Sequence, residues 1–288
     1  MKIAITGARG SVGREVVRVC AEAGHDTIHI NRSPEEPDGT PRSEVRTADV
    51  AGDYDAFVRA LKGCDALIHL AALPDPVGKA DHVVFSNNVL AAFNGFRAAA
   101  EVGITRVCYA SSVNAIGLAF ATQPLKFPYF PIEEESYPCN PTDSYALSKQ
   151  EAEVAAKAFV NWFPGMRIAC MRIHNVGARK DVAEEHAKDW EGTAVKELWG
   201  WVNPTATARA CLMSVWDDES VAKGEKWAGC EIFNIVAPTT TQDDKSSEQL
   251  AKKYYPDAEL RGDFKGHRGF WATDKARKLL GWTHHEKE

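Results

Sequence analysis

The chain has 288 residues, of which 44% are hydrophobic and 26% are charged, and a formal net charge of −6. A chain of this length can bury a substantial core, either as one domain or as one domain with an appended lobe. The negative balance argues against nucleic acid as a main partner, because binding to phosphates requires a basic surface. No apolar run approaches the roughly 20 residues of a membrane span, so we expect no membrane partner either.

The beginning of the chain and its cysteines bear on the cellular compartment. The N-terminal residues enter a strand-like apolar run at once, which leaves no room for a signal peptide. Seven cysteines are scattered along the chain without a Cys-x-x-Cys pair. This distribution indicates reduced thiols rather than a disulfide framework or a zinc site. We therefore expect a cytoplasmic protein without a bound metal.

The first two-thirds of the chain alternates short apolar runs with helical patterns, which is typical of βαβ units on a parallel sheet. After residue 175 the sequence becomes irregular and rich in tryptophan. We predict an α/β fold in which a doubly wound parallel (Rossmann) sheet spans 1–175, 230–236 returns to it, and 176–288 form mostly a small C-terminal substrate-binding lobe. The predicted strands are Lys2–Thr6, Thr27–Asn31, Val45–Ala48, Ala66–Leu70, Thr105–Ser111, Arg167–Arg172 and Glu231–Val236. The predicted helices are Val12–Ala23, Tyr54–Lys62, His82–Val102, Asp143–Trp162, Ser247–Tyr255 and Asp274–Leu280.

Three glycines, Gly7, Gly10 and Gly13, lie where the first predicted strand ends and the first helix begins. Glycine permits a tight turn and a close approach of the backbone, and a helix N-terminus offers unpaired N–H groups to a pyrophosphate. An ordinary glycine-rich turn is the alternative. The position of the motif in the first βαβ unit favours dinucleotide binding.

The end of the second strand bears on the choice between NAD and NADP. An NAD site usually has an acid there, which accepts a hydrogen bond from the ribose 2′-hydroxyl, but this chain has Asn31 followed by Arg32. Together with Arg9 in the glycine loop, Arg32 would bind a 2′-phosphate, which favours NADP with NAD as the alternative. Two other interpretations stay open: both arginines are solvated surface charges, or Glu35 or Asp38 folds back to the hydroxyl.

Tyr145 and Lys149 are four residues apart and therefore share one face of a predicted helix. A free tyrosine titrates near about pH 10, and a neighbouring ammonium lowers its pKa, so that Tyr145 becomes an acid or base for an alcohol or carbonyl. Ser111 and Ser112 end the fifth strand at the same rim of the sheet, where a hydroxyl can orient the substrate oxygen. A surface pair and capping serines are the alternatives, and the glycine loop favours the catalytic interpretation.

These motifs resemble those of the extended (atypical) short-chain dehydrogenases/reductases of the NAD-dependent epimerase/dehydratase group, over nearly the whole chain. The resemblance implies a Rossmann fold, a nicotinamide cofactor, and a catalytic set of Ser112, Tyr145 and Lys149, with Ser111 as the fallback for the serine. It rests on residues 6–13, Asp49-Val50, His69–Ala72, Asn88-Val89, Ser111-Ser112 with Gly117, Tyr145 with Lys149, residues 172–177 and residues 274–282.

The same resemblance implies further contacts with the cofactor. One of them, His174 on the nicotinamide side, has an alternative interpretation as a histidine packed in the core. The implied contacts are Asp49 and Val50 at the adenine, Leu70, Ala71 and Ala72 near the phosphates and ribose, Asn88 ordering the active-site helix or a proton-relay water, and His174 and Asn175 on the nicotinamide and substrate side. Tyr145 and Lys149 are predicted to contact the cofactor as well, since the lysine can hold the hydroxyls of the nicotinamide ribose.

The substrate is less well determined. Relatives that act on nucleotide sugars are commonly longer, and this chain lacks a basic cluster for a diphosphate after residue 175, which favours a small organic or sugar-like substrate. The neighbourhoods 111–117 and 145–149 are partly similar to those of uronate dehydrogenases, which keep the NAD-type acid. The aromatic, proline-rich segment 118–135 would overhang the site as a pocket wall or pack on the core as a flap, and the charged segment 179–201 is a candidate lid.

The leading hypothesis is an NADP-preferring oxidoreductase that interconverts an alcohol and a carbonyl on a small molecule. Two alternatives stay open: an epimerase or dehydratase that recycles a tightly bound cofactor, and a regulatory protein that senses NADP without chemistry. The two long predicted helices pair into a dimer interface in many relatives, so we expect a homodimer.

Overall fold

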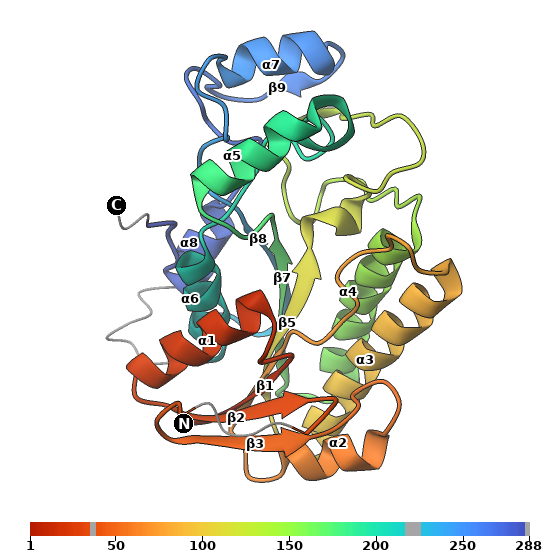
Figure 1. The fold of residues 1–288 in the computed structure, drawn as a ribbon, viewed down its shortest axis with the longest axis vertical. Coiled ribbons are helices and arrows are strands. Elements are labelled where there is room, and N and C mark those ends of the chain that lie inside the picture. Colours follow the sequence, from red (N-terminus) through yellow and green to blue (C-terminus); the bar gives the residue numbers. More distant parts are fainter. Residues whose placement is uncertain (35–38, 217–225, 286–288) are drawn as a thin grey trace.

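The computed structural model describes residues 1–34, 39–216 and 226–285. Its centre is a seven-stranded parallel sheet, shown in Figure 1. The strands are β1 (Lys2–Thr6), β2 (Asp26–Asn31), β3 (Ser43–Thr47), β4 (Ala66–His69), β5 (Arg106–Ser112), β7 (Arg167–Ile173) and β8 (Gly229–Ile235). Their order is β3-β2-β1-β4-β5-β7-β8, so the winding direction reverses between β1 and β4. Ligands of such sheets bind at this reversal, beside the carboxyl ends of the strands.

Helices cover both faces of the sheet, as Figure 1 shows. This double cover explains why the central strands are continuous apolar runs, since both of their faces are buried. One layer holds α1 (Ser11–Glu22), α6 (Pro204–Val215) and α8 (Asp274–Leu280), and the other holds α2 (Tyr54–Leu61), α3 (Asp81–Glu101) and α4 (Ser144–Trp162). The predicted doubly wound α/β fold is confirmed, and the predicted strands and helices are present with ends that differ by a residue or two.

The helix α6 was not predicted from the sequence. Its residues are mostly small, so its apolar periodicity is weak, although Asn203 caps it and Pro204 occupies its first turn. It packs against α1 on the sheet. Residues after 175 therefore supply α6, β8 and α8 to the sheet layers in addition to a lobe, and the predicted limits of the two domains stay a prediction.

The lobe lies beyond the carboxyl ends of β7 and β8 (Figure 1). It contains α5 (Arg179–Lys188), a π-helical turn at Trp190–Ala194, α7 (Ser247–Tyr254), and the short parallel pair β6 (Tyr129–Phe130) and β9 (Glu259–Leu260). A separate aromatic core holds it together, in which Phe130, Trp199 and Phe270 are fully buried. This lobe closes one side of the space above the sheet.

All seven cysteines are free thiols, and four of them are buried. No helix in the described ranges is long and apolar enough to cross a bilayer. The same ranges contain no group of three or more His, Cys, Asp or Glu side chains that could hold a metal ion.

Candidate active site

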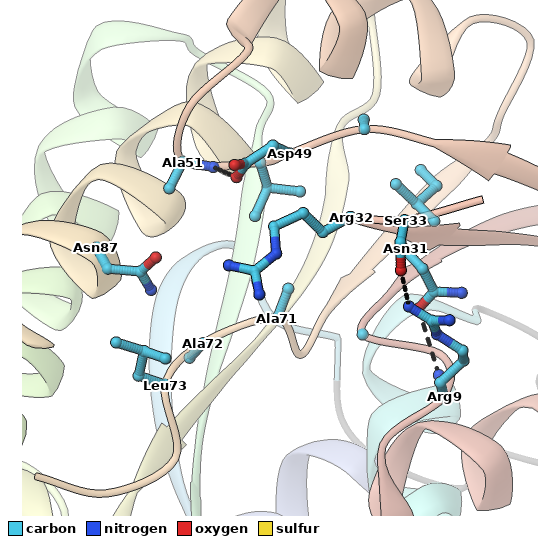
Figure 2. A pocket seen from close by; sticks show the side chains of 14 residues that line it. Arg9, Asn31, Arg32, Ser33, Asp49, Ala51, Ala71, Ala72, Leu73 and Asn87 are labelled. Atoms are coloured by element: carbon cyan, nitrogen blue, oxygen red, sulfur yellow. Dashed lines mark hydrogen bonds between the residues drawn. The ribbon is translucent and has the colours of Figure 1, made fainter. Parts of the chain in front are cut away.

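Two cavities lie along the carboxyl edge of the sheet. The first, of about 270 Å³, lies at the ends of β1, β2 and β4 and is shown in Figure 2. Eight of the residues predicted to contact the cofactor line it, together with Ser33, Leu73 and Asn87, which were not predicted. The eight are Gly7, Arg9, Asn31, Arg32, Asp49, Val50, Ala71 and Ala72.

The glycine loop brings backbone into places where a side chain would not fit. Gly7 has a φ of +68°, and a Cβ built on it would lie 3.1 Å from the backbone nitrogen of Ala71. A Cβ on Gly13 would lie 2.2 Å from the carbonyl oxygen of Gly7, so α1 packs directly on the loop. Gly10 precedes α1 without a side-chain cap, which leaves the N–H groups of the first turn to a ligand. This cradle fits the pyrophosphate of a dinucleotide, although Gly10 and Gly13 shape the loop and do not line the cavity.

Two arginines lie at the end of β2. In Figure 2 the guanidinium of Arg32 extends into the cavity between Asp49 and Ala71. The guanidinium of Arg9 donates to the Ser33 hydroxyl at 2.6 Å, so it is held at the same strand end. The alternative acids Glu35 and Asp38 lie outside the described residues.

The carboxylate of Asp49 forms hydrogen bonds within its own turn. Its Oδ1 accepts hydrogen bonds from the backbone N–H groups of Ala51 and Gly52, both at 3.1 Å. This turn holds Val50 and Ala51 against the wall of the first cavity.

The second cavity, of about 360 Å³, lies between the ends of β5 and β7, the start of α4 and the lobe. It contains the predicted catalytic residues and the predicted nicotinamide-side residues. Its lining includes Ser112, Tyr145, Lys149, His174, Asn175, Leu70, Ala72, Ser111, Asn114, Phe120 and Glu197.

Tyr145 lies in the first turn of α4, which Asp143 caps by accepting a hydrogen bond from Ala146. Burial raises the pKa of Tyr145 to about 12, and a hydrogen bond with Ser112 opposes that rise. The lowering of the tyrosine pKa by Lys149 stays a prediction, and the largest effect on this pKa is the desolvation of the phenol. Tyr145 therefore carries its proton at neutral pH.

Lys149 lies one turn further along α4, with its Nζ 5.6 Å from the centroid of the Tyr145 ring. The ammonium donates to the carbonyl oxygen of Ala110 at 2.6 Å, which fixes it at the end of β5. Burial lowers the pKa of Lys149 to about 8. The group thus holds a positive charge beside the tyrosine at neutral pH.

The two serines at the end of β5 have different environments. The hydroxyl of Ser111 donates to Glu153 at 2.6 Å, and Glu153 in turn pairs with the buried Arg172 at 2.8 Å. Ser112 instead accepts a hydrogen bond from the Asn114 backbone at 3.1 Å, where a short 3₁₀ helix (Val113–Ile116) begins. Ser112 lines the second cavity with Tyr145 and lowers the pKa of its phenol, whereas the Ser111 hydroxyl is engaged by Glu153.

His174 and Asn175 form the opposite wall. The ring of His174 is buried, accepts from the Asn175 backbone at 2.7 Å through Nδ1, and lies 3.0 Å from the Glu197 carbonyl oxygen through Nε2. Burial lowers the pKa of His174 to about 4, so the ring is neutral. His174 is thus both packed in the core and part of the cavity wall.

Asn88 lines neither cavity. Its buried amide bonds to the backbone of Leu73 in both directions and donates to the Ser148 hydroxyl at 3.3 Å. It therefore joins α3, the segment after β4 and α4.

Phe120, from a segment that was predicted to overhang the site, lines the second cavity, and so do Asn114 and Glu197, which were not predicted. Phe120, from the aromatic segment 118–135, packs edge-on against the ring of Tyr145, whereas Phe127 and Phe130 of that segment belong to the lobe core. Glu197 comes from the charged segment 179–201 and had no motif around it. The sequence signal that could have indicated Glu197 is its place directly before the apolar run that begins at Leu198.

This layout, with a glycine cradle at the first strand and a serine, tyrosine and lysine at the end of the fifth, defines an extended short-chain dehydrogenase/reductase. A family model described as "NAD dependent epimerase/dehydratase family" matches residues 3–191. The chain belongs to this family.

Individual relatives cover less of the chain. An "NAD-dependent glucose-6-phosphate dehydrogenase" of Haloferax volcanii is 31% identical over 54% of this chain and 62% of its own length. An "L-arabinose 1-dehydrogenase (NAD(P)(+))" of the same organism is 34% identical over 43% of this chain and 46% of its own length. The matches thus span roughly half of these curated relatives.

Solved structures share the fold over the whole chain. A uronate dehydrogenase from Agrobacterium tumefaciens has a TM-score of 0.66 at 19% identity, over 99% of this chain and 84% of that one. A UDP-galactose 4-epimerase has a TM-score of 0.67 at 22% identity, over 99% and 94%. The expected likeness to uronate dehydrogenases is confirmed for the fold.

Proposed function

We propose that this protein is an NADP-preferring oxidoreductase that interconverts an alcohol and a carbonyl on a small sugar-like molecule. The observation that carries the proposal is the convergence of Ser112, Tyr145 and Lys149 on one cavity of about 360 Å³ at the end of β5. A protein that only bound a dinucleotide would need the glycine cradle but not this set. The names of the relatives, which are dehydrogenases and epimerases of sugars, support the substrate class.

The bound nicotinamide would supply or accept the hydride in this chemistry. In carbonyl reduction the Tyr145 hydroxyl donates its proton to the substrate oxygen, and in alcohol oxidation the phenolate takes it back. Ser112 bonds to that same oxygen and orients it toward the phenol. The charge of Lys149 stabilises the phenolate that forms, in a site where burial strengthens the interaction.

The preference for NADP rests on the arrangement at the end of β2. Asn31 replaces the usual acid, its side chain accepts from the Arg9 backbone at 3.4 Å, and Arg32 lines the cavity. A guanidinium matches the geometry of a phosphate, whereas no carboxylate of β2 stands there to bond a 2′-hydroxyl. Titration of the protein with NADPH and NADH tests this preference directly.

The catalytic role is tested by Tyr145→Phe. This variant should abolish turnover on a panel of carbonyl and sugar substrates while the dissociation constant for NADPH changes little. Tyr54→Phe, on the far helix α2, is the matched control and should keep full turnover. Unchanged turnover in Tyr145→Phe would contradict the proposal.

An epimerase or dehydratase with a recycled cofactor is the second candidate, favoured by the structural likeness to a UDP-galactose 4-epimerase. It predicts an isomeric or dehydrated product without net consumption of NADPH. A purely NADP-sensing role is the third candidate, and turnover of any substrate would exclude it.

We also propose a homodimer through α3 and α4. Val83 and Leu90 on α3, and Leu147 and Val154 on α4, are exposed at intervals of one heptad, so each helix presents an apolar stripe. Light scattering after size exclusion should give twice the chain mass of 31.6 kDa. Val154→Asp should shift the protein to the monomer.

A further inference from the structure

Glu197 brings a carboxylate to the second cavity from the lobe. Glu197 is only 8% exposed, yet it lines the same cavity as Tyr145 and Ser112. The wall opposite the catalytic tyrosine therefore carries an acid, which the mechanism above does not use.

The two oxygens of this carboxylate have different surroundings. Oε2 accepts hydrogen bonds from the amide of Asn175 and lies 3.2 Å from Nε2 of the fully buried His186. His186 is held in turn by the Thr241 hydroxyl, at 2.8 Å from its Nδ1. For Oε1 there is no hydrogen-bond partner within residues 1–34, 39–216 and 226–285. One oxygen thus anchors the group and the other is available to a ligand.

The backbone after Glu197 is held in an unusual conformation. Leu198 and Trp199 both have positive φ values, 55° and 52°, although neither is glycine and both are fully buried. Such strain persists where the surrounding packing fixes it, and it is concentrated at functional sites. Gly200 follows, where a Cβ would lie 2.3 Å from the ring of His174. This bend follows directly after Glu197, which lines the cavity.

The balance of charge in the cavity decides which substrate it can hold. Among the described residues that line it, Lys149 and Glu197 are the charged ones, and none is an arginine. The ammonium of Lys149 is engaged by the Ala110 carbonyl at 2.6 Å. A substrate carboxylate or phosphate near Glu197 would be repelled at short range in a site of low dielectric, and the one cation among the described lining residues, Lys149, is held at the end of β5 beside Tyr145.

We propose that Glu197 is a specificity-determining residue, which accepts a hydrogen bond from a hydroxyl of an uncharged polyhydroxy substrate and excludes sugar acids and sugar phosphates. This inference rests on the proposed function and narrows its substrate class. It separates this chain from the activities named for its relatives on uronates and on glucose 6-phosphate.

The test compares substrates that differ only in charge: D-glucose, D-glucuronate and D-glucose 6-phosphate, with D-galactose and D-galacturonate as a second series. The wild-type protein should favour the neutral sugar in kcat/KM. Glu197→Gln keeps the shape of the side chain and removes its charge. It should lower the ratio of kcat/KM for the neutral sugar to kcat/KM for the charged sugar about 10- to 100-fold, which corresponds to the free energy of a hydrogen bond to a charged group. Glu197→Asp keeps the charge and should keep the discrimination even if turnover falls.

Glu191→Gln, at an exposed acid on the preceding π-helical turn, is the matched control and should leave the preference unchanged. A merely structural role of Glu197 would lower kcat/KM for every sugar alike, and an unchanged ratio in Glu197→Gln would overturn the inference. A wild-type preference for the acids, or turnover confined to carbonyl compounds without hydroxyl groups, would overturn it while the oxidoreductase function stands. Cofactor binding with no turnover of any compound would overturn the proposed function and this assignment with it.

Discussion

The two cavities along the carboxyl edge of the sheet are built in different ways. The first, around Gly7 and Arg32, is made of backbone brought close by glycines and of exposed cationic side chains. The second, around Tyr145, is made of buried polar side chains that hold one another, and burial shifts their pKa values. Under the proposed function, the first region would recognise the cofactor by shape and solvated charge, and the second would act through desolvated groups.

This difference predicts how each region responds to mutation. An exposed arginine contributes modestly to binding and little to stability, because solvent screens its charge in both cases. A buried polar group has partners that would be left unpaired if it were removed, so its loss affects folding as well as chemistry.

The largest expected effect is a loss of stability when a buried ion pair behind the second cavity is broken. Arg172 and Glu153 form a buried pair at 2.8 Å, and Glu153 also accepts from Ser111. Arg172→Met should lower the free energy of unfolding by about 3–5 kcal/mol, because it leaves a buried carboxylate without its cation. Urea denaturation measures this loss, and adding Glu153→Gln should recover part of it. A loss below about 1 kcal/mol would show that the second region is not held together by its buried charges.

The next effect concerns the backbone shape of the first cavity. Gly13→Ala would place a Cβ 2.2 Å from the Gly7 carbonyl oxygen, so α1 must move away from the loop. We expect the dissociation constant for NADPH to rise about 100-fold or more, since such overpacking costs several RT. Quenching of protein fluorescence by NADPH measures it. Gly63→Ala, at the end of α2 with nothing near its Cβ, should leave the affinity unchanged.

The contrast also explains what the sequence could predict. The glycine spacing and the i,i+4 pair of Tyr145 and Lys149 are local patterns, and the structure brings them to one edge of the predicted sheet. The strands were predictable because buried parallel strands are continuous apolar runs. Local patterns therefore predicted the fold and those residues around each cavity that lie next to a strand end.

What the sequence could not show depends on long-range packing. Glu197 lines the second cavity next to a backbone bend at Leu198 and Trp199, which no local pattern marks. The pKa of Tyr145 depends on how deeply the ring is buried, and the sequence argument had only its neighbour Lys149 to consider. The helix α6 was missed because its small residues give a weak apolar stripe.

A pH dependence should distinguish the second region from a solvated site. Because burial lowers the pKa of Lys149 to about 8, the ammonium loses its proton as the pH rises through that value, whereas Tyr145, with a pKa of about 12, keeps its own. We expect kcat/KM for carbonyl reduction to fall about tenfold between pH 7 and pH 9. Lys149→Met should be slower throughout and flat across this range. A wild-type profile that is equally flat would contradict the role of the ammonium.

The smallest expected effect is at the exposed side of the first cavity. Arg32→Ala should lower the ratio of NADPH to NADH affinity about fivefold, because a solvent-exposed ion pair contributes at most about 1 kcal/mol. Its free energy of unfolding should stay within about 0.5 kcal/mol of the wild type, unlike that of Arg172→Met. Titration with both cofactors measures the ratio, at low salt because salt screens such contacts. Arg59→Ala, an exposed arginine of α2 away from both cavities, is the control and should leave the ratio unchanged. A ratio that also stays unchanged in Arg32→Ala would leave Arg9, held at Ser33, as the arginine that recognises the 2′-phosphate, and Arg9→Ala alone should then lose the preference.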